Sequence, residues 1–363
     1  MIFTKAFFGL WLFSCSLWAD APLGLPPLTI PADNPQSPEK VALGKKLFNE
    51  SRFSADGTIS CASCHDPSKA FTDGLDRARG INQQQGNRNS PTVVNAAYYT
   101  SLFLDGRRDS LEKQALDPFV NLIEHGLADW RLITKTIKND SKYPRQFQTV
   151  FKIATSEITI DHVAKAIASF ERTLVAGNSP FDRYFFTGDQ QALSQSAARG
   201  SRLFRRKGNC ANCHEISSDN ALFTDNRFYN IGVGFSALQP RLNRSLKSGN
   251  DPDAASFRKN KNTLTDIQRS ELGRFAVTGI ISDMGKFRTP TLRNIALTAP
   301  YMHDGSMKTL EEVVEYYDKG GEKNPYLDPA IFPLNLTQQE KTDLVSFLES
   351  LTSTALLPTE KLD

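Results

Sequence analysis

The hydrophobic residues of this chain recur mostly with the period of an α-helix. The pattern predicts one helix over 161–175, and its apolar stripe consists of Val163, Ile167, Phe170 and Leu174. His162 lies off this stripe, so we expect a surface histidine there and not a metal ligand. Segments with one apolar face indicate a mainly α-helical protein.

A second helix is predicted over 337–351, near the end of the chain. Thr337 and Glu340 have the T-x-x-E spacing of a capping box, in which two side chains satisfy backbone N–H groups at a helix start. The apolar positions of this segment are Leu344, Val345, Leu348 and Leu351. We expect this helix to close the C-terminal core.

A third helix is predicted in the segment 309–321, which reads TLEEVVEYYDKGG. Thr309 and Glu312 form another capping box, and Gly320 and Gly321 end the segment. The i, i+3, i+4, i+7 face of this helix consists of Leu310, Val313, Val314 and Tyr317.

The two adjacent tyrosines of this helix are expected to point in different directions. Tyr316 is rotated by about 100° from the apolar face, so Tyr317 should point into the core and Tyr316 toward its edge. The pattern leaves two roles open for Tyr317. It is either a core tyrosine whose hydroxyl finds a hydrogen-bond partner, or a metal ligand.

A weak internal repeat divides the chain. ALGKKLF at 42–48 and ARGSRLF at 198–204 share the pattern G-x-x-L-F, which suggests two similar halves. The segment 178–189 is interpreted as the connection between them. The polar run 236–262 is expected to be a solvated loop.

The N-terminus has the composition of a secretory signal peptide. MIFTK carries a positive charge, AFFGLWLFSCSLW is a short apolar run, and ADA supplies small residues. We expect cleavage after Ala19, which gives a signal peptide at 1–19 and a periplasmic location. No later segment is long and apolar enough to cross a bilayer, so an integral membrane protein is not expected.

Four cysteines follow the expected signal peptide, and they lie in two short motifs. CASCH contains Cys61, Cys64 and His65, and CANCH contains Cys210, Cys213 and His214. C-x-x-C-H is the attachment motif of c-type haem, in which two thiols bind the haem vinyl groups and the histidine binds iron. Two disulfides or a zinc site would leave both histidines unexplained. The motifs therefore predict two covalently bound haem c groups.

The charge does not point to nucleic acid. The formal net charge is +3 over 363 residues, and two haems would add four negative propionates. We find no basic stripe with interleaved aromatic residues, so no nucleic-acid partner is expected.

A long ordered set of motifs runs through the chain: CASCH, AFTDG, RNSPTVVNAAY, DGRRDSLEKQALDPF, CANCH, FRTPTLRNIALTAPYMHDG and EEVVEYYDKGG. This set resembles the bacterial di-haem cytochrome c peroxidase family and is most similar to its MauG-like branch. The resemblance implies a mainly α-helical fold of two cytochrome c-like domains with the haems near their interface. We expect the N-terminal, peroxidatic domain at 20–185 and the C-terminal, electron-transfer domain at 186–363.

The resemblance also assigns the far-side ligand of the C-terminal haem. In the family this ligand lies fourteen residues after the histidine of HDG, as methionine in the peroxidases and as tyrosine in MauG. Counting from His303 leads to Tyr317, so His214 and Tyr317 are expected to hold this iron. The competing thioether ligands are Met284, Met302 and Met307, none of which stands at the matching position.

For the N-terminal haem, the resemblance implies an open iron position that reacts with peroxide. Members with a closed resting state carry a histidine sixteen residues after the haem histidine, where this chain has Ile81. The matching peroxide-side residues are Gln114, Pro118 and Glu124. Glu124 would transfer a proton between the peroxide oxygens, Gln114 would orient the ligand and Pro118 would crowd the open face.

Three positions depart from the family pattern. Leu104 replaces the tryptophan that usually lies between the haems, and Gly208 replaces a surface tryptophan found before the second haem motif in the partner-oxidising member. His125 stands where methionine is frequent. We interpret His125 as a loop histidine, with a second acid–base group and an iron ligand as alternatives.

Two hypotheses follow for the activity, both of them using hydrogen peroxide. The first is a peroxidase that takes electrons from a small periplasmic donor, a cytochrome c or a copper protein. The second is a MauG-like oxidase that modifies tyrosine or tryptophan of a partner protein. A pure electron carrier is disfavoured because it would gain nothing from an open iron. The family also implies one Ca²⁺, held by the Asn89 side chain and the carbonyls of Thr298 and Pro300.

Overall fold

The computed structural model describes residues 21–239 and 264–356, and it is mainly α-helical, as expected. The expected signal peptide at 1–19, its cleavage after Ala19 and residues 240–262 of the polar run lie outside the described residues. None of the helices within the described ranges combines the length and the apolar character that crossing a membrane requires.

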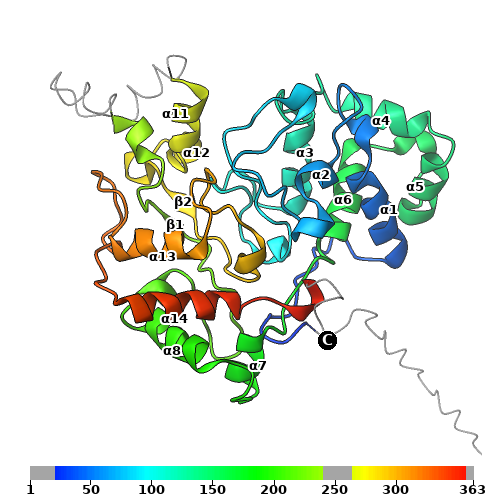
Figure 1. Ribbon diagram of the computed structural model, residues 1–363. Helices are drawn as coiled ribbons and strands as arrows, with labels where there is room; N and C mark the ends of the chain where they lie inside the picture. The colour runs from blue at the N-terminus through cyan, green and yellow to red at the C-terminus, as the bar shows by residue number, and fades with distance from the viewer. Residues whose placement is uncertain (1–20, 240–263, 357–363) are drawn as a thin grey trace, which may run out of the picture.

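The helices fall into two groups that lie side by side (Figure 1). The first group consists of α1 Pro38–Phe48, α2 Cys61–Cys64, α3 Leu111–Val120, α4 Arg131–Lys138, α5 Tyr143–Phe151 and α6 Ile160–Glu171. The second consists of α7 Pro180–Phe186, α8 Gln195–Arg205, α11 Asp266–Glu271, α12 Phe275–Thr278, α13 Leu310–Asp318 and α14 Gln338–Glu349.

The remaining elements are short. Strands β1 (Phe228–Tyr229) and β2 (Phe287–Arg288) pair antiparallel, with Tyr229 opposite Phe287. The 3-10 turns are η1 Ser51–Phe53, η2 Pro67–Lys69, η3 Ile81–Gln83, η4 Ala96–Tyr98, η5 Thr155–Glu157, η6 Cys210–Asn212, η7 Phe235–Ala237, η9 Ile281–Asp283, η10 Ile295–Leu297 and η11 Thr354–Leu356.

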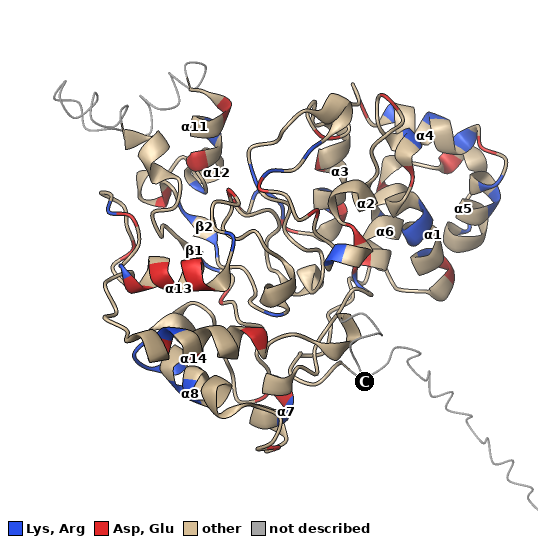
Figure 2. Ribbon diagram, viewed as in Figure 1, with Lys and Arg blue, Asp and Glu red and all other residues tan. Residues whose placement is uncertain are grey.

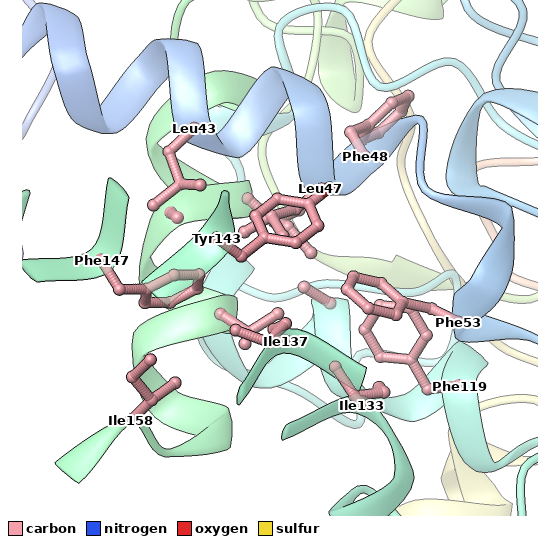
Figure 3. Close-up of a cluster of buried hydrophobic side chains, with 14 of the residues drawn as sticks. Leu43, Leu47, Phe48, Phe53, Phe119, Ile133, Ile137, Tyr143, Phe147 and Ile158 are labelled. Carbon is pink, nitrogen blue, oxygen red and sulfur yellow. The ribbon is translucent and has the colours of Figure 1, made fainter. Parts of the chain in front are cut away.

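Each half has its own apolar core. In the first half, phenylalanines and branched aliphatic residues from α1, α3, α4, α5 and α6 interdigitate, with Phe53 and Phe119 edge to face at 5.9 Å (Figure 3). In the second half, Phe181, Phe204, Phe223 and Phe347 form a cluster of mutually packed rings. Two separate cores support the division into two domains.

The two halves use the same helix crossing. A Cβ on Gly44 of α1 would lie 1.9 Å from the Ala166 carbonyl oxygen of α6. A Cβ on Gly200 of α8 would lie 1.9 Å from the Asp343 carbonyl oxygen of α14. The glycine of each G-x-x-L-F motif is therefore required for close contact between two helix backbones. The repeat read from the sequence is confirmed as a structural repeat.

The other predicted helices agree with the structure, apart from one boundary. Thr309 and Thr337 cap α13 and α14 through the two predicted capping boxes. Helix α6, however, ends at Glu171 and not near residue 175. Leu174 lies in the following turn, where its carbonyl accepts a hydrogen bond from the Asn95 amide at 2.8 Å. The apolar spacing continued past the true helix end because this turn also faces the core.

The segment at 178–189 is more than a connection. Its residues 180–186 form α7, and Phe181 is fully buried in the second core. Asp182 of this helix makes a bidentate ion pair with Arg293 at 2.9 and 3.0 Å, with both side chains almost fully buried. Helix α7 therefore packs as part of the second half.

Candidate functional site

The two histidines of the haem motifs are held in the same way. His65 Nδ1 lies 3.2 Å from the Phe71 carbonyl oxygen, and His214 Nδ1 lies 2.9 Å from the Phe223 carbonyl oxygen. This hydrogen bond fixes Nδ1 as the donor and leaves Nε2 free to bind a metal. Burial lowers the pKa of both imidazoles, which favours the neutral form that a metal ligand requires.

The motif cysteines lie on single helical turns. Cys61 is the first residue of α2 and Cys64 is its last. Cys210 is the first residue of η6, and Cys213 directly follows the end of η6. All four thiols are unpaired, so the alternative of two disulfides does not hold. Each following histidine packs near the motif phenylalanine of its own half, with ring centroids 6.4 Å apart for both Phe48–His65 and Phe204–His214.

A large apolar cavity lies in the second half. It is lined by both motif cysteines, His214 and Tyr317, and by residues that include Leu104 and Asn89 from the first half. The cavity thus places an imidazole and a phenol, which are both potential iron ligands, around one space beside two thiols. This donor set and the apolar walls fit a haem c, as the motif predicts.

The structure separates the roles of the two tyrosines. The Tyr316 hydroxyl donates to the Ile231 carbonyl at 2.9 Å and accepts from the Glu322 amide at 3.0 Å. Tyr316, and not Tyr317, therefore has the hydrogen bonds expected of a core tyrosine. Tyr317 lines the cavity, and burial raises the pKa of its hydroxyl.

The competing methionines occupy different surroundings. Met284 is fully buried in a third apolar cluster with Phe235 and Phe275, and it is not among the residues that line the cavity. Met307 packs against the second core, and its amide and carbonyl bridge to Tyr301. Met302 does line the cavity, so among the three it is the one that shares the space with His214.

A second internal repeat becomes visible once the structure is known. Residues 90–118 and 289–317 share a sequence pattern and an order of structural features, with a constant offset of 199 positions. Asn95 and Asn294 both have positive φ, at 62° and 63°. The bridge Leu102–Arg108 corresponds to Tyr301–Met307, and the caps Ser110 and Thr309 start α3 and α13.

This repeat places Pro118 of α3 at the position of Tyr317 in α13. The sequence signal of this repeat is S/T-P-T-x-x-N, followed by D-G and by a helix that begins at a serine or threonine cap. Proline carries no side-chain donor atom, whereas a phenol oxygen can bind iron. The same helix position therefore carries a possible ligand in one half and a non-ligand in the other.

Glu124 lies beside the position of Ile81. The Ile81 amide donates to the Glu124 carbonyl at 2.9 Å, and a Cβ on Gly80 would lie 1.8 Å from the Ile123 carbonyl oxygen. Asn121 donates to the Glu124 carboxylate at 2.7 Å. Burial raises the pKa of Glu124, so this carboxyl exchanges protons closer to neutral pH than an ordinary glutamate.

Gln114 and Pro118 lie four residues apart on α3 and therefore share one face of that helix. His125, by contrast, is a structural residue. Its side chain is buried, Nδ1 lies 2.9 Å from the Phe53 carbonyl oxygen, and its ring packs edge to face against Phe119 at 4.9 Å. His162 caps the start of α6, where its Nδ1 accepts from the Thr159 amide at 3.1 Å, as a histidine outside the metal sites would.

The three residues expected around calcium all line the cavity of the second half. Asn89 comes from the first half, while Thr298 and Pro300 come from the second. The Asn89 side-chain amide donates to the Leu75 carbonyl at 2.7 Å, and the Asn89 backbone amide donates to the His303 carbonyl at 2.9 Å. Across the described ranges, no three histidine, cysteine or acidic residues are grouped as a metal site.

Two further pairs near the cavity were missed by the sequence analysis. His303 Nε2 lies 2.7 Å from Glu271 Oε2, both side chains are buried, and Phe287 stacks on the imidazole at 3.9 Å. The Tyr229 hydroxyl donates to Asp225 Oδ2 at 2.6 Å. Glu271 and His303 are 32 residues apart and meet only through the fold, so no local sequence signal marks them. Asp225 and Tyr229 are four residues apart, and the structure shows that their side chains meet.

Comparison with known proteins finds two matching protein families along the chain. The family described as di-haem cytochrome c peroxidase matches residues 38–191, and the family described as cytochrome c matches residues 197–352. A crystal structure of a MauG-like protein associated with microbial copper homeostasis superposes with a TM-score of 0.77 and 32% identity. That match covers 95% of this chain and 99% of the other.

Two relatives are similar over most of their length. The cytochrome-c peroxidase IdrP1 of Denitromonas iodatirespirans is 40% identical over 346 residues, which cover 92% of this chain and 87% of the relative. The methylamine utilization protein MauG of Methylorubrum extorquens is 39% identical over 321 residues, covering 88% and 80%. With its two haem c domains, the chain therefore belongs to the family of di-haem cytochrome c peroxidases and MauG, and it is a peroxidase-type oxidoreductase.

Proposed function

We propose that the protein is a periplasmic peroxidase that reduces hydrogen peroxide at a five-coordinate N-terminal haem. Electrons arrive through a C-terminal haem that is held by His214 and Tyr317. The observation that carries this proposal is the equivalence of Pro118 and Tyr317 in the internal repeat. A proline on the far side supports an open iron, and a tyrosine at the same place supports a closed one.

When bound, each haem supplies a redox-active iron, and the N-terminal one offers a free position to peroxide. The protein supplies the proton transfer. Glu124, held by Asn121 and Ile81, takes a proton from the near oxygen of peroxide and returns it to the far oxygen. Burial raises the pKa of Glu124, so its carboxylate accepts a proton more readily than that of an ordinary glutamate.

Two residues of α3 shape the open side. Pro118 crowds it and cannot bind iron, while Gln114 on the same helix face orients the bound peroxide. Ile81 stands where a closed state would need histidine, and its side chain is buried. The N-terminal site is thus ready for peroxide without a prior reduction step.

The C-terminal site is suited to receive electrons at its edge. Phe332 lines the cavity and is 46% exposed, so an aromatic ring connects the site to the surface. Acidic residues are frequent in α13, the helix that carries Tyr317 (Figure 2). An exposed ring beside an acidic helix supports docking of a small cytochrome c or copper protein that carries a complementary positive patch.

A second candidate function is the oxidation of tyrosine or tryptophan in a partner protein, as in MauG. The similarity to MauG and to the copper-associated MauG-like protein supports it. Leu104 and Gly208 count against it, since both stand where a tryptophan would conduct oxidising equivalents. We also propose one Ca²⁺ held by Asn89, Thr298 and Pro300, which would join the two halves.

Stopped-flow kinetics with reduced cytochrome c and peroxide test the activity. We expect rapid turnover by the oxidised protein without pre-reduction. Negligible turnover together with covalent oxidation of a partner would replace the peroxidase by the MauG-like function. If the oxidised protein has two six-coordinate haems and does not react with peroxide, both proposals are wrong.

The ligand assignment is tested by absorbance and EPR spectra of the oxidised protein. Tyr317→Phe should convert the C-terminal haem to a different coordination state and alter its low-spin spectrum. Tyr316→Phe is the matched control, because its hydroxyl bonds only to backbone groups among the described residues. An unchanged spectrum in Tyr317→Phe would remove this residue as ligand.

A further inference from the structure

Tyr229 and Asp225 form a short hydrogen bond next to the second haem motif. The phenol donates to Asp225 Oδ2 at 2.6 Å. The carboxylate is itself held in place, because the Arg227 amide donates to Oδ1 at 2.9 Å and the Asp225 amide donates to the Cys213 carbonyl at 2.9 Å. The pair is therefore fixed to the residue that anchors the haem.

The phenol ring also borders the haem site. Tyr229 lines the same cavity as Cys213, His214 and Tyr317. It ends β1, where it faces Phe287 across the strand pair. Its side chain is half-buried, so the ring lies between the cavity and the surface.

Comparison of the two halves shows that only the second half has this pair. AFTDG at 70–74 and LFTDN at 222–226 align with an offset of 152, which makes Asp73 the counterpart of Asp225. Asp73 accepts a hydrogen bond from Ser90 at 3.1 Å. The counterpart of Tyr229 at the same offset is Arg77. The carboxylate is common to both halves, whereas the oxidisable ring belongs to the half proposed to carry electrons.

A phenol can donate an electron readily only if its proton leaves at the same time, since the protonated radical cation is a strong acid. A carboxylate within hydrogen-bond distance takes that proton without diffusion. Leu104 and Gly208, which line the same cavity, carry no oxidisable side chain. Tyr229 thus combines an oxidisable ring, a proton acceptor and a place at the haem site.

We propose that Tyr229 is a proton-coupled electron relay of the C-terminal haem, with Asp225 as its proton acceptor. This inference rests on the proposed function for its oxidant, hydrogen peroxide. Peroxide takes up two electrons and two protons from solvent to give two waters. Tyr229 would supply one of these electrons by way of the C-terminal haem, and the donor protein would supply the other. The phenol O–H bond breaks, its proton moves to Asp225 Oδ2, and a neutral tyrosyl radical remains. An electron from the donor protein then restores the phenol as the proton returns.

Freeze-quench EPR of the di-haem protein after peroxide addition tests the relay. We expect a tyrosyl radical signal that narrows when the protein contains ring-deuterated tyrosine. Tyr229→Phe should lose this signal while keeping the haem absorbance of the unmodified protein. Asp225→Asn keeps the geometry of the pair but accepts a proton poorly, so it should slow radical formation by about a hundredfold, as expected for loss of a positioned base.

Tyr143 provides a matched control, because its hydroxyl donates to Glu50 Oε2 at 2.9 Å but its ring packs in the core of the first half. Tyr143→Phe should keep the radical signal. An equal signal in Tyr229→Phe would overturn the proposal, and so would a signal that disappears only in Tyr143→Phe. In that case the Tyr229–Asp225 pair would only anchor the loop after the haem motif.

A second experiment separates this proposal from the peroxidase function. Flash-generated ruthenium(III) tris-bipyridine oxidises the holo-protein by one electron without peroxide. We expect a transient tyrosyl absorbance that depends on Tyr229 and forms more slowly in deuterated solvent. Absence of a Tyr229-dependent transient would overturn the relay even if peroxide turnover is intact. If the Tyr229-dependent transient forms in a protein that does not react with peroxide, the relay proposal stands and the peroxidase proposal is wrong.

Discussion

The two halves of this molecule share a scaffold and differ at one equivalent position of α3 and α13. Both pack a glycine-bearing helix against a second helix, and both fix the haem histidine through a carbonyl of a phenylalanine. At equivalent positions of α3 and α13, one half has Pro118 and the other Tyr317. Under the proposed ligand assignment, this difference means that a single side chain on a duplicated scaffold separates an open iron site from a closed one.

The buried face of the C-terminal helix in each half shows a second difference. The contacts of Gly44 with Ala166 and of Gly200 with Asp343 align α6 with α14, which makes Leu348 the counterpart of Glu171. Glu171 is buried, with Oε2 lacking a hydrogen-bond partner among the described residues. An ionisable group thus replaces an aliphatic one in the half that is proposed to react with peroxide.

The largest expected effect tests whether the shared scaffold is equally essential in both halves. In each of the variants Gly44→Val and Gly200→Val, the new Cβ would lie 1.9 Å from a carbonyl oxygen of the facing helix. We expect each change to destabilise its half by about 4 kcal/mol or more, because the helices must separate. Thermal unfolding followed by circular dichroism measures this.

Gly86→Ala is the control for these two variants, since its new Cβ would meet only ordinary contacts at 3.4 Å or more. Its unfolding temperature should stay close to that of the unmodified protein. A mild effect of Gly200→Val beside a severe one of Gly44→Val would show that the two crossings are not equivalent.

The next effect concerns Glu171. Burial raises its pKa to about 8, so the folded protein keeps a proton that the unfolded chain loses above its ordinary pKa of about 4.3. The stability contribution of this group is complete at low pH and falls as pH rises toward 8, by at most about 1.4 kcal/mol per pH unit. Glu171→Leu, which copies the second half, should flatten this decline in denaturant unfolding measured from pH 5 to 9. An unchanged slope would contradict the assignment.

A smaller effect is expected for Glu124, the proposed proton-transfer residue of the first half. Glu124→Gln keeps the size of the side chain but cannot exchange a proton, so peroxide should react about a hundredfold more slowly, at the lower end for a positioned acid–base group. Because burial raises the pKa of Glu124, the rate in the unmodified protein should fall with acid from a higher pH than an ordinary glutamate would give. Stopped-flow rates across pH measure both, and an unaffected rate would exclude the role.

The smallest expected effect distinguishes Tyr316 from Tyr317 in the second half. Tyr316→Phe removes the two hydrogen bonds to Ile231 and Glu322 and should cost about 1 kcal/mol of unfolding free energy. Chemical denaturation measures this cost. A loss of the low-spin haem spectrum in this variant would mean that Tyr316, and not Tyr317, contributes to the haem site.

The sequence by itself determined the parts of this protein that depend on local chemistry. The two C-x-x-C-H motifs require thiols and histidine at fixed spacing, and the capping boxes at Thr309 and Thr337 are satisfied within one helical turn. The inward direction of Tyr317 followed from helical periodicity in the same way. Such features were predictable because residues a few positions apart determine them.

Only the tertiary structure decided what depends on contacts between distant segments. It showed that α6 ends at Glu171, that α7 packs with the second half and that His125 is buried against Phe119. It also brought Tyr229 to the cavity edge. Burial and long-range hydrogen bonds assign these roles, and a linear pattern does not contain the neighbours that create them.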